Sequence, residues 1–199
     1  MEQAKSYDKI AEFYDALASL AEWFISKNRK QILQLARGHI LEVGVGTGNS
    51  FKDYSTRKQI AAVDISKEML LRAADKFKAY DGDVELVLAD IGHLPFGDGS
   101  FETVFSSLVL CSTASPVRKL REMRRVAKQD CRLLMIEHVK SKNRFLGYWM
   151  EKLNPLVAPL DNINRETVEN VEKAGWTVKQ NRNLAGDIFK AIVAEKQNK

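Results

Sequence analysis

Three alternating glycines at the end of an apolar run constrain this chain more than any other feature. The run Ile40–Val43 is followed directly by Gly44, Gly46 and Gly48. This pattern predicts a buried strand that turns sharply into a helix. Glycine is needed where the backbone takes a positive φ, or where a ligand must approach main-chain atoms closely. We therefore predict a ligand-binding turn at this point of the chain.

Acidic residues close the next two apolar runs. Asp64 follows the run 60–63, and Asp90 follows the run 84–89. In doubly wound nucleotide-binding folds, a carboxylate roughly 20 residues after the glycine turn binds the ribose hydroxyls. Three successive strands are thus expected to end in polar groups at one rim of a parallel sheet.

The glycine spacing and Glu42 distinguish between classes of nucleotide. The dinucleotide fingerprint is G-x-G-x-x-G, which places a helix N-terminus against a pyrophosphate. Here the spacing is G-x-G-x-G, and Glu42 comes just before it. A carboxylate at this place repels a pyrophosphate and attracts an ammonium group. S-adenosylmethionine (SAM) carries an ammonium and a sulfonium but no phosphate, so the pattern favours SAM.

The motifs resemble those of class I SAM-dependent methyltransferases. The stretch Glu42–Gly48, E-x-G-x-G-x-G, resembles their first motif. Asp64 resembles their ribose-binding acid, and the pair Asp90-Ile91 resembles their adenine-binding pair. The stretch Leu94–Phe101, L-P-F-x-D-x-S-F, is similar to the lead-in to strand 4 in the ubiquinone/menaquinone-biosynthesis type.

Several groups within this family share further motifs with the chain. Bacterial phospholipid N-methyltransferases share Ile40–Gly48 and Val63–Leu70, whereas a thiol-methylating, methyltransferase-like group shares Leu108–Ser112, Glu137–Val139 and Asn164–Glu166. The resemblance implies methyl transfer to an apolar or lipid-like acceptor, with a phospholipid amine as the first candidate. A small thiol and a quinone precursor are alternatives. A SAM-binding regulator without catalysis is an alternative of another class.

The resemblance and the expected strand ends together assign the candidate site residues. SAM is the expected cofactor and S-adenosylhomocysteine the product. The candidate cofactor-binding residues are Tyr14, Glu42, Gly44, Gly46, Thr47, Gly48, Asn49, Asp64, Ile65, Met69, Asp90, Ile91, Ser106 and Ser107. The candidate substrate-binding residues are Tyr7, Cys111 and Trp149.

His138 is the histidine best placed for catalysis, because it ends the strand expected at 132–138. A base is needed only if the acceptor starts protonated: a phenol, thiol or carbon acid needs one more than an amine does. The alternative is a hydrogen-bonded residue that shapes the rim. No metal site is expected, since the three histidines and two cysteines lie far apart in the sequence.

Alternating strands and helices predict one domain over residues 1–199. The expected class is an α/β, Rossmann-like methyltransferase: a mostly parallel seven-stranded sheet with helices on both faces and an antiparallel edge strand. Strands are expected at 39–43, 59–64, 84–89, 101–107, 132–138, 177–180 and 188–194. Helices are expected after Ser66, from Pro116 and after Asn164, with a turn at 127–130.

Two segments are predicted to border the acceptor. Residues 1–37 read as helical, and Tyr7–Asp15 resembles a Y-D-x-x-A-x-x-Y-D segment that forms a lid over the cofactor; a helix simply packed on the sheet is the alternative. Residues 140–161 look like an inserted rim segment. Aromatic residues lie beside cations at 23–30 and 140–152, which suits contact with an anionic membrane. The alternative is that both stretches close a pocket.

Composition limits the partners further. The net charge of +5 permits an anionic membrane surface, and no apolar run is long enough to cross a bilayer. The basic run 118–125 has no interleaved aromatic residues, so we expect a solvated helix face and no nucleic acid. Two cysteines without C-x-x-C spacing, and no visible signal peptide, favour the cytoplasm. The oligomeric state and the acceptor stay open.

Overall fold

The computed structural model describes residues 19–54, 58–111, 113–139, 166–184, 187 and 189–196, with side chains from residue 25 onward. Several predicted site residues therefore lie outside the described part of the chain. These are Tyr7 and Tyr14 of the expected lid and Trp149 of the rim segment 140–161.

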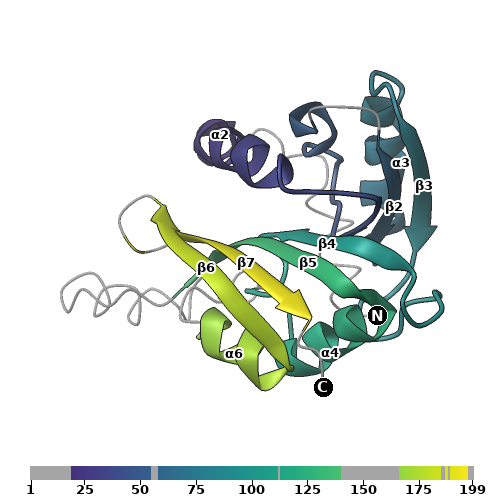
Figure 1. Cartoon of the computed structure of the whole chain (residues 1–199). Helices are drawn as coiled ribbons and strands as arrows, with labels where there is room; N and C mark the ends of the chain where they lie inside the picture. Colours follow the sequence, from purple (N-terminus) through teal and green to yellow (C-terminus); the bar gives the residue numbers. More distant parts are fainter. Residues whose placement is uncertain are drawn as a thin grey trace.

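Seven strands form a single sheet in the order β3-β2-β1-β4-β5-β7-β6 (Figure 1). Strands β1 to β5 pair in parallel, whereas β7 runs antiparallel to both β5 and β6. The prediction of a mostly parallel sheet that ends in an antiparallel pair is confirmed. The strands are β1 (His39–Val43), β2 (Gln59–Asp64), β3 (Asp83–Leu88), β4 (Phe101–Ser107), β5 (Ala127–His138), β6 (Trp176–Leu184) and β7 (Phe189–Lys196).

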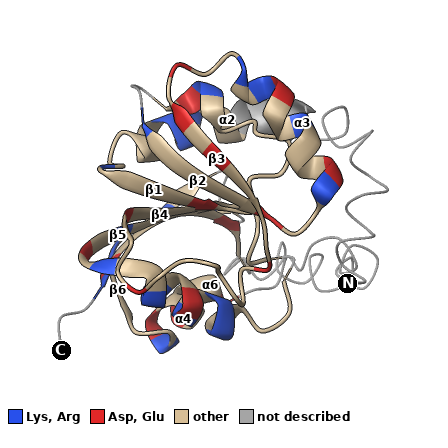
Figure 2. Ribbon diagram, turned by 90° about the vertical axis from the view of Figure 1, so that its right-hand side faces the viewer, with Lys and Arg blue, Asp and Glu red and all other residues tan. Residues whose placement is uncertain are grey.

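Helices cover both faces of the sheet (Figures 1 and 2). Helices α2 (Ser19–Leu33) and α3 (Lys67–Phe77) lie on one face, and α4 (Pro116–Val126) and α6 (Thr167–Lys173) lie on the other. A short 3-10 helix, η1 (Phe51–Asp53), follows the glycine turn. This arrangement is the predicted Rossmann-like architecture, which places ligands outside the carboxyl ends of the parallel strands.

The central strands are apolar because both of their sides are covered. Successive side chains of a strand point to opposite faces. Ile40 accordingly packs into the core beneath α2 and α3, and Leu41 packs into the core above α4 and α6. Both side chains are fully buried. Continuous apolar strands of this kind are typical of parallel sheets with helices on both faces.

The helix starts follow the local signals in the sequence. Ser66 caps α3, because its hydroxyl accepts a hydrogen bond from the Met69 backbone N–H at 3.2 Å. Pro116 occupies the first turn of α4, where its missing N–H costs nothing. The apolar face of α4 is buried as expected; it consists of Leu120, Met123 and Val126.

Some predicted boundaries were wrong. Residues 127–130 are not a turn, since β5 begins at Ala127 directly after α4 and pairs there with Phe101 before the register shifts. Ala127 is buried, and its carbonyl accepts a hydrogen bond from Lys196 Nζ at 2.6 Å. Helix α6 begins at Thr167, later than a cap at Asn164 would place it, and β6 and β7 are longer than predicted.

Candidate functional site

Glycine is required at the three positions of the turn for different structural reasons. All three take a positive φ: +65° at Gly44, +55° at Gly46 and +78° at Gly48. A Cβ at Gly44 would lie 2.3 Å from Val109 Cγ2, and one at Gly48 would lie 3.1 Å from the Ala73 backbone. Within the described part of the chain, a Cβ at Gly46 would meet no atom within 4 Å. Gly44 and Gly48 therefore allow close packing, whereas Gly46 borders open space that a ligand can enter.

Asp64 holds the glycine turn against the end of β2. Its Oδ2 accepts a hydrogen bond from the Gly46 backbone N–H at 2.8 Å, and its Oδ1 accepts one from the Ser66 N–H at 2.9 Å. The residue is buried, with 8% exposed. A carboxylate oxygen can accept more than one hydrogen bond, so this geometry is compatible with ribose hydroxyls bound to the same group.

Glu42 lies buried beneath the turn. The hydroxyl of Tyr54 donates a hydrogen bond to Glu42 Oε2 at 2.9 Å. Burial raises the pKa of Glu42 from 4.5 to about 7, against the opposing effects of Tyr54 and of the positive charge of Arg29. A cation bound near this carboxyl would favour its ionised form.

A buried ion pair joins α2 to the segment that follows the turn. Arg29 pairs with Asp53 at 2.6 Å and donates to the Asn49 carbonyl at 3.0 Å. Ser26 donates to the other oxygen of Asp53 at 2.8 Å. Arg29 and Ile25 are both 4% exposed, so the expectation that residues 23–30 present Arg29 and Ile25 to a membrane is wrong.

The loop after β3 presents the second predicted acid. Asp90 Oδ1 accepts a hydrogen bond from the Gly92 N–H at 2.8 Å and lies 3.5 Å from Lys119 Nζ. This hydrogen bond, with the charge of Lys119, lowers the pKa of Asp90. Ile91 beside it is buried. Lys119 belongs to the basic run that was expected to form a solvated helix face, but its side chain is 14% exposed and contacts Asp90 instead.

The side chains of Thr47 and Asn49 are held by α3. Lys76 Nζ donates hydrogen bonds to Thr47 Oγ1 at 3.0 Å and to Asn49 Oδ1 at 2.5 Å. The sequence did not reveal Lys76, because its partners lie almost thirty residues away. Met69 is buried in the first turn of the same helix. The predicted contacts of these residues with a cofactor stay predictions.

On the acceptor side, one buried carboxylate organises the loop after β4. Glu137 Oε1 accepts hydrogen bonds from the Ser106 hydroxyl at 3.0 Å and from the backbone N–H groups of Val109 and Leu110 at 3.2 and 3.1 Å. Its Oε2 accepts one from the Cys111 N–H at 3.1 Å. Burial raises the pKa of Glu137, and these backbone hydrogen bonds oppose the rise.

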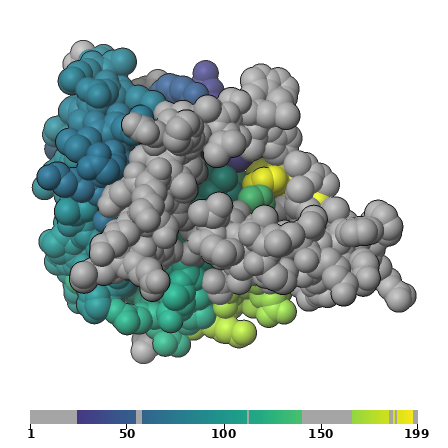
Figure 3. Space-filling view, turned by 180° about the vertical axis from the view of Figure 1, so that it is seen from behind, coloured from purple at the N-terminus to yellow at the C-terminus, as the bar shows by residue number. Residues whose placement is uncertain are grey.

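The remaining predicted rim residues lie around this carboxylate. Ser106 and Cys111 are buried, whereas Ser107 and His138 are half-buried. The His138 ring packs on Phe189 of β7, with 4.0 Å between the ring centroids. Figure 3 shows green and yellow parts of the chain side by side on the rear surface, in keeping with the pairing of β5 and β7.

The residues at this edge fit SAM. Among the described residues the space beside Gly46 is open, and the carboxylate of Asp64 lies next to it, hydrogen-bonded to the Gly46 N–H. Carboxylates suit ribose hydroxyls and an ammonium group, and they repel phosphate. We find no group of three or more histidine, cysteine, aspartate and glutamate side chains within the described ranges that could hold a metal ion.

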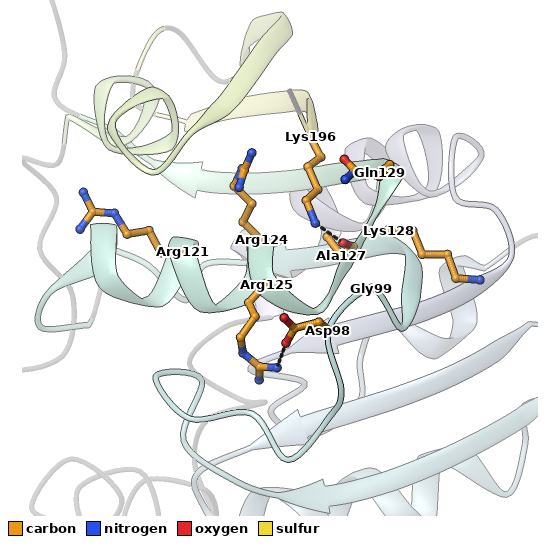
Figure 4. Close-up of a pocket in the computed structure, with 9 residues that line it drawn as sticks. All are labelled: Asp98, Gly99, Arg121, Arg124, Arg125, Ala127, Lys128, Gln129 and Lys196. Carbon is orange, nitrogen blue, oxygen red and sulfur yellow. Dashed lines mark hydrogen bonds and ion pairs between the residues drawn. The ribbon is translucent and has the colours of Figure 1, made fainter. Parts of the chain in front are cut away.

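A second, basic cavity of about 530 Å³ lies at the opposite edge of the sheet (Figure 4). Internal partners engage its cations: Arg125 pairs with Asp98 at 2.7 Å, and Arg124 Nε donates to the Gly175 carbonyl at 2.9 Å. Cations near the last turn of α4 stabilise the carbonyl end of that helix. The cavity is lined by Asp98, Gly99, Arg121, Arg124, Arg125, Ala127, Lys128, Gln129 and Lys196.

Comparisons with known proteins agree with this geometry. The family described as "Methyltransferase domain" matches residues 41–148, more than half of the 199 residues. A phosphatidylethanolamine N-methyltransferase of Cereibacter sphaeroides is 36% identical over 103 residues, which are 51% of this chain and 51% of the relative. The human thiol S-methyltransferase TMT1A is 29% identical over 145 residues, or 69% of this chain and 59% of the relative. The chain thus spans only half to three fifths of the length of these relatives.

A solved structure shows the same fold over nearly the whole chain. It is a SAM-dependent methyltransferase from Thermotoga maritima, with a TM-score of 0.72, 21% sequence identity, and coverage of 96% of this chain and 98% of its own. In the part of this chain that the structure describes, no helix has the length and apolarity that a membrane span requires.

Proposed function

Because the chain belongs to the methyltransferase domain family, we propose that it transfers a methyl group from SAM to an apolar acceptor, in the first place a phospholipid amine. The family membership confirms the resemblance to class I SAM-dependent methyltransferases that the motifs indicated. The observation that carries the proposal is the open space beside Gly46, next to the carboxylate of Asp64. SAM supplies a methyl group that its sulfonium activates for transfer.

The residues of the edge then take separate roles. Asp64 binds the ribose hydroxyls, and Asp90 with Ile91 binds the adenine end. Glu42 stabilises the ammonium group, since a buried carboxylate is poorly screened by water. Positioning of this kind is the main contribution of a protein to a reaction whose reagent is already activated, and it can be worth about 7–11 kcal/mol.

Likeness to a phosphatidylethanolamine N-methyltransferase supports a phospholipid amine as the acceptor. Likeness to a thiol S-methyltransferase supports a small thiol as the second candidate. An amine of suitable pKa needs little help from a base, whereas a thiol needs more, and His138 is the candidate for that role. We also propose that the segment Tyr7–Trp23 closes over the cofactor as a lid, and that the protein works in the cytoplasm at an anionic membrane surface.

A methylation screen tests the acceptor. SAM turnover to S-adenosylhomocysteine is measured with phosphatidylethanolamine vesicles, demethylated quinones and small alkyl thiols. Turnover with the phospholipid supports the first candidate, and turnover with a thiol or quinone alone replaces it. SAM binding without turnover of any acceptor would indicate a binding regulator. No SAM affinity in calorimetric titration would overturn the whole proposal.

Sedimentation with anionic liposomes tests the membrane surface. Lys27 and Lys30 are exposed on α2, so a variant with both replaced by glutamine should bind vesicles less well than the parent chain. The matched control replaces the exposed lysines Lys67 and Lys78, on and just after α3, by glutamine. No sedimentation at low salt, together with methylation of a soluble acceptor, would exclude a membrane role.

A further inference from the structure

The loop after β4 folds around one hydrogen-bond acceptor, the carboxylate of Glu137. Three consecutive backbone N–H groups, those of Val109, Leu110 and Cys111, point to the carboxylate of Glu137 at 3.1–3.2 Å. The Ser106 hydroxyl supplies a fourth hydrogen bond at 3.0 Å. Glu137 is fully buried, and three of these four donors converge on its Oε1 while the Cys111 N–H reaches its Oε2. Such a buried carboxylate is stable only when it is hydrogen-bonded in this way.

The same loop lies against the glycine turn. Leu108, which opens it, takes a φ of +57°, which is unusual for a residue other than glycine. Its N–H donates to the Ile136 carbonyl at 2.8 Å, next to Glu137. Val109 then packs so closely on Gly44 that a Cβ there would lie 2.3 Å from its side chain. The loop therefore forms a wall that contacts the cofactor turn on one side.

We infer that Glu137 is the positioning residue of the acceptor half: its carboxylate fixes residues 108–111, and through them the place where the acceptor meets the methyl donor. The inference rests on the proposed function for its consequence, but its structural part does not depend on the acceptor. Glu137 acts on the methyl acceptor indirectly, through the loop. SAM is bound by the glycine turn and by Asp64, not by Glu137.

Two substitutions of Glu137 distinguish the hydrogen bond from the Cys111 N–H from the other three hydrogen bonds to this carboxylate. Glu137→Gln keeps an oxygen that can accept from Ser106, Val109 and Leu110, but its amide NH2 faces the Cys111 N–H, which loses its acceptor. Glu137→Ala removes both carboxylate oxygens, so all four donors lose their hydrogen-bond acceptor. The matched control is Glu195→Gln, the same substitution on β7, where the side chain is 45% exposed.

Amide hydrogen exchange gives a readout that does not require the methyl acceptor to be known. In the parent chain, residues 109–111 should exchange as slowly as strand amides although they lie in a loop. Exchange should quicken about ten- to a hundredfold at Cys111 in Glu137→Gln and at all three residues in Glu137→Ala, because each loses a hydrogen bond to a charged group. Glu195→Gln should leave it unchanged.

Kinetics then separate positioning from general damage. In Glu137→Gln, the SAM dissociation constant should stay within about threefold of the parent value, while kcat/KM for the acceptor falls about tenfold or more. An equal loss of SAM affinity and acceptor kcat/KM would reduce Glu137 to a structural residue. Fast exchange of 109–111 in the parent chain would overturn the inference even if no variant folds. If no acceptor is found, exchange and SAM affinity still decide it.

Discussion

The two halves of the carboxyl edge are built in different ways. In the proposed donor half, β2 ends in an acid and β3 is followed by one, and each accepts a hydrogen bond from the backbone two residues on: Asp64 from the N–H of Ser66, and Asp90 from that of Gly92. Asp64 also accepts one from the Gly46 N–H, 18 residues before it. In the acceptor half, Glu137 gathers donors that lie 26 to 31 residues away. The acids of the proposed donor half can therefore be recognised as sequence motifs although some of their contacts are distant, whereas the contacts of the proposed acceptor half depend on how β4 and β5 pair.

Breaking the ion pair between Arg29 and Asp53 would test whether local features suffice for the donor half. Both side chains are 5% exposed, so Asp53→Ala leaves a buried guanidinium without its partner. We expect a loss of about 3–5 kcal/mol in the free energy of unfolding, measured with urea. In the control Asp130→Ala, whose pair with Arg37 is exposed, the loss should stay below about 1 kcal/mol. Equal effects would show that the turn needs no support from α2.

Gly44→Ala would disturb the contact between the two halves. The new Cβ meets Val109 Cγ2 at 2.3 Å, and the residue must keep a φ of +65°. Strain and overpacking together should cost about 2–4 kcal/mol of stability. Gly97→Ala is the control, because its Cβ would meet Ser100 Oγ at 3.7 Å, an ordinary contact distance, and no other atom of the described residues within 4 Å. Thermal unfolding compares the two variants, and a Gly44→Ala protein as stable as Gly97→Ala would contradict the contact.

Asp64→Ala should weaken SAM binding by about 1–3 kcal/mol, because bound ribose hydroxyls lose a charged acceptor. Calorimetric titration measures this loss, with Asp75→Ala as the control, since Asp75 is exposed on α3. SAM affinity equal in both variants would remove Asp64 from the cofactor site, and NAD binding tighter than SAM binding in the parent chain would contradict SAM as the cofactor. The contrast with Glu137→Gln, which should spare SAM binding, sharpens the division between the halves.

The same contrast explains how much the sequence could predict. The bounds of β1 and β2 were predicted to the residue, because apolar runs end there at glycine or an acid. Arg29 was misread as a surface cation because its partner Asp53 lies 24 residues away. The start of β5 was missed since Lys128 and Asp130 look like turn residues, whereas the strand already pairs with β4 at Ala127, opposite Phe101.

The contacts of Glu137 were likewise not predictable, because they join residues that are distant in the sequence. The sequence shows that Glu137 ends a strand near the rim, but it carries no sign of the three N–H groups that the side chain binds. Those partners become neighbours only when β4 and β5 pair and Leu108 takes a positive φ. Sequence motifs therefore identify the methyl donor, whereas the acceptor depends on contacts that folding creates.

The last two predictions concern the proton on Glu42. Its pKa of about 7 in the folded chain exceeds the ordinary value of 4.5, so the unfolded chain releases this proton first as the pH rises. Stability should therefore fall by about 3 kcal/mol between pH 4.5 and 7 through this group, and level off above. Urea unfolding of Glu42→Gln should lack this component.

SAM binding should show the opposite trend, because its ammonium favours the ionised carboxyl. Between pH 6 and 7.5 the ionised fraction of a group with a pKa of about 7 rises roughly eightfold, and SAM affinity should rise by up to that factor. This pH range ends below the pKa of an α-amino group, about 7.7–8.0, because above that pKa the ammonium of SAM loses its charge. Calorimetry in buffers of different ionisation enthalpy should detect proton release on binding. The same slope in Glu42→Gln would place the titrating group elsewhere, and no slope in the parent chain would mean that Glu42 does not interact with the ammonium.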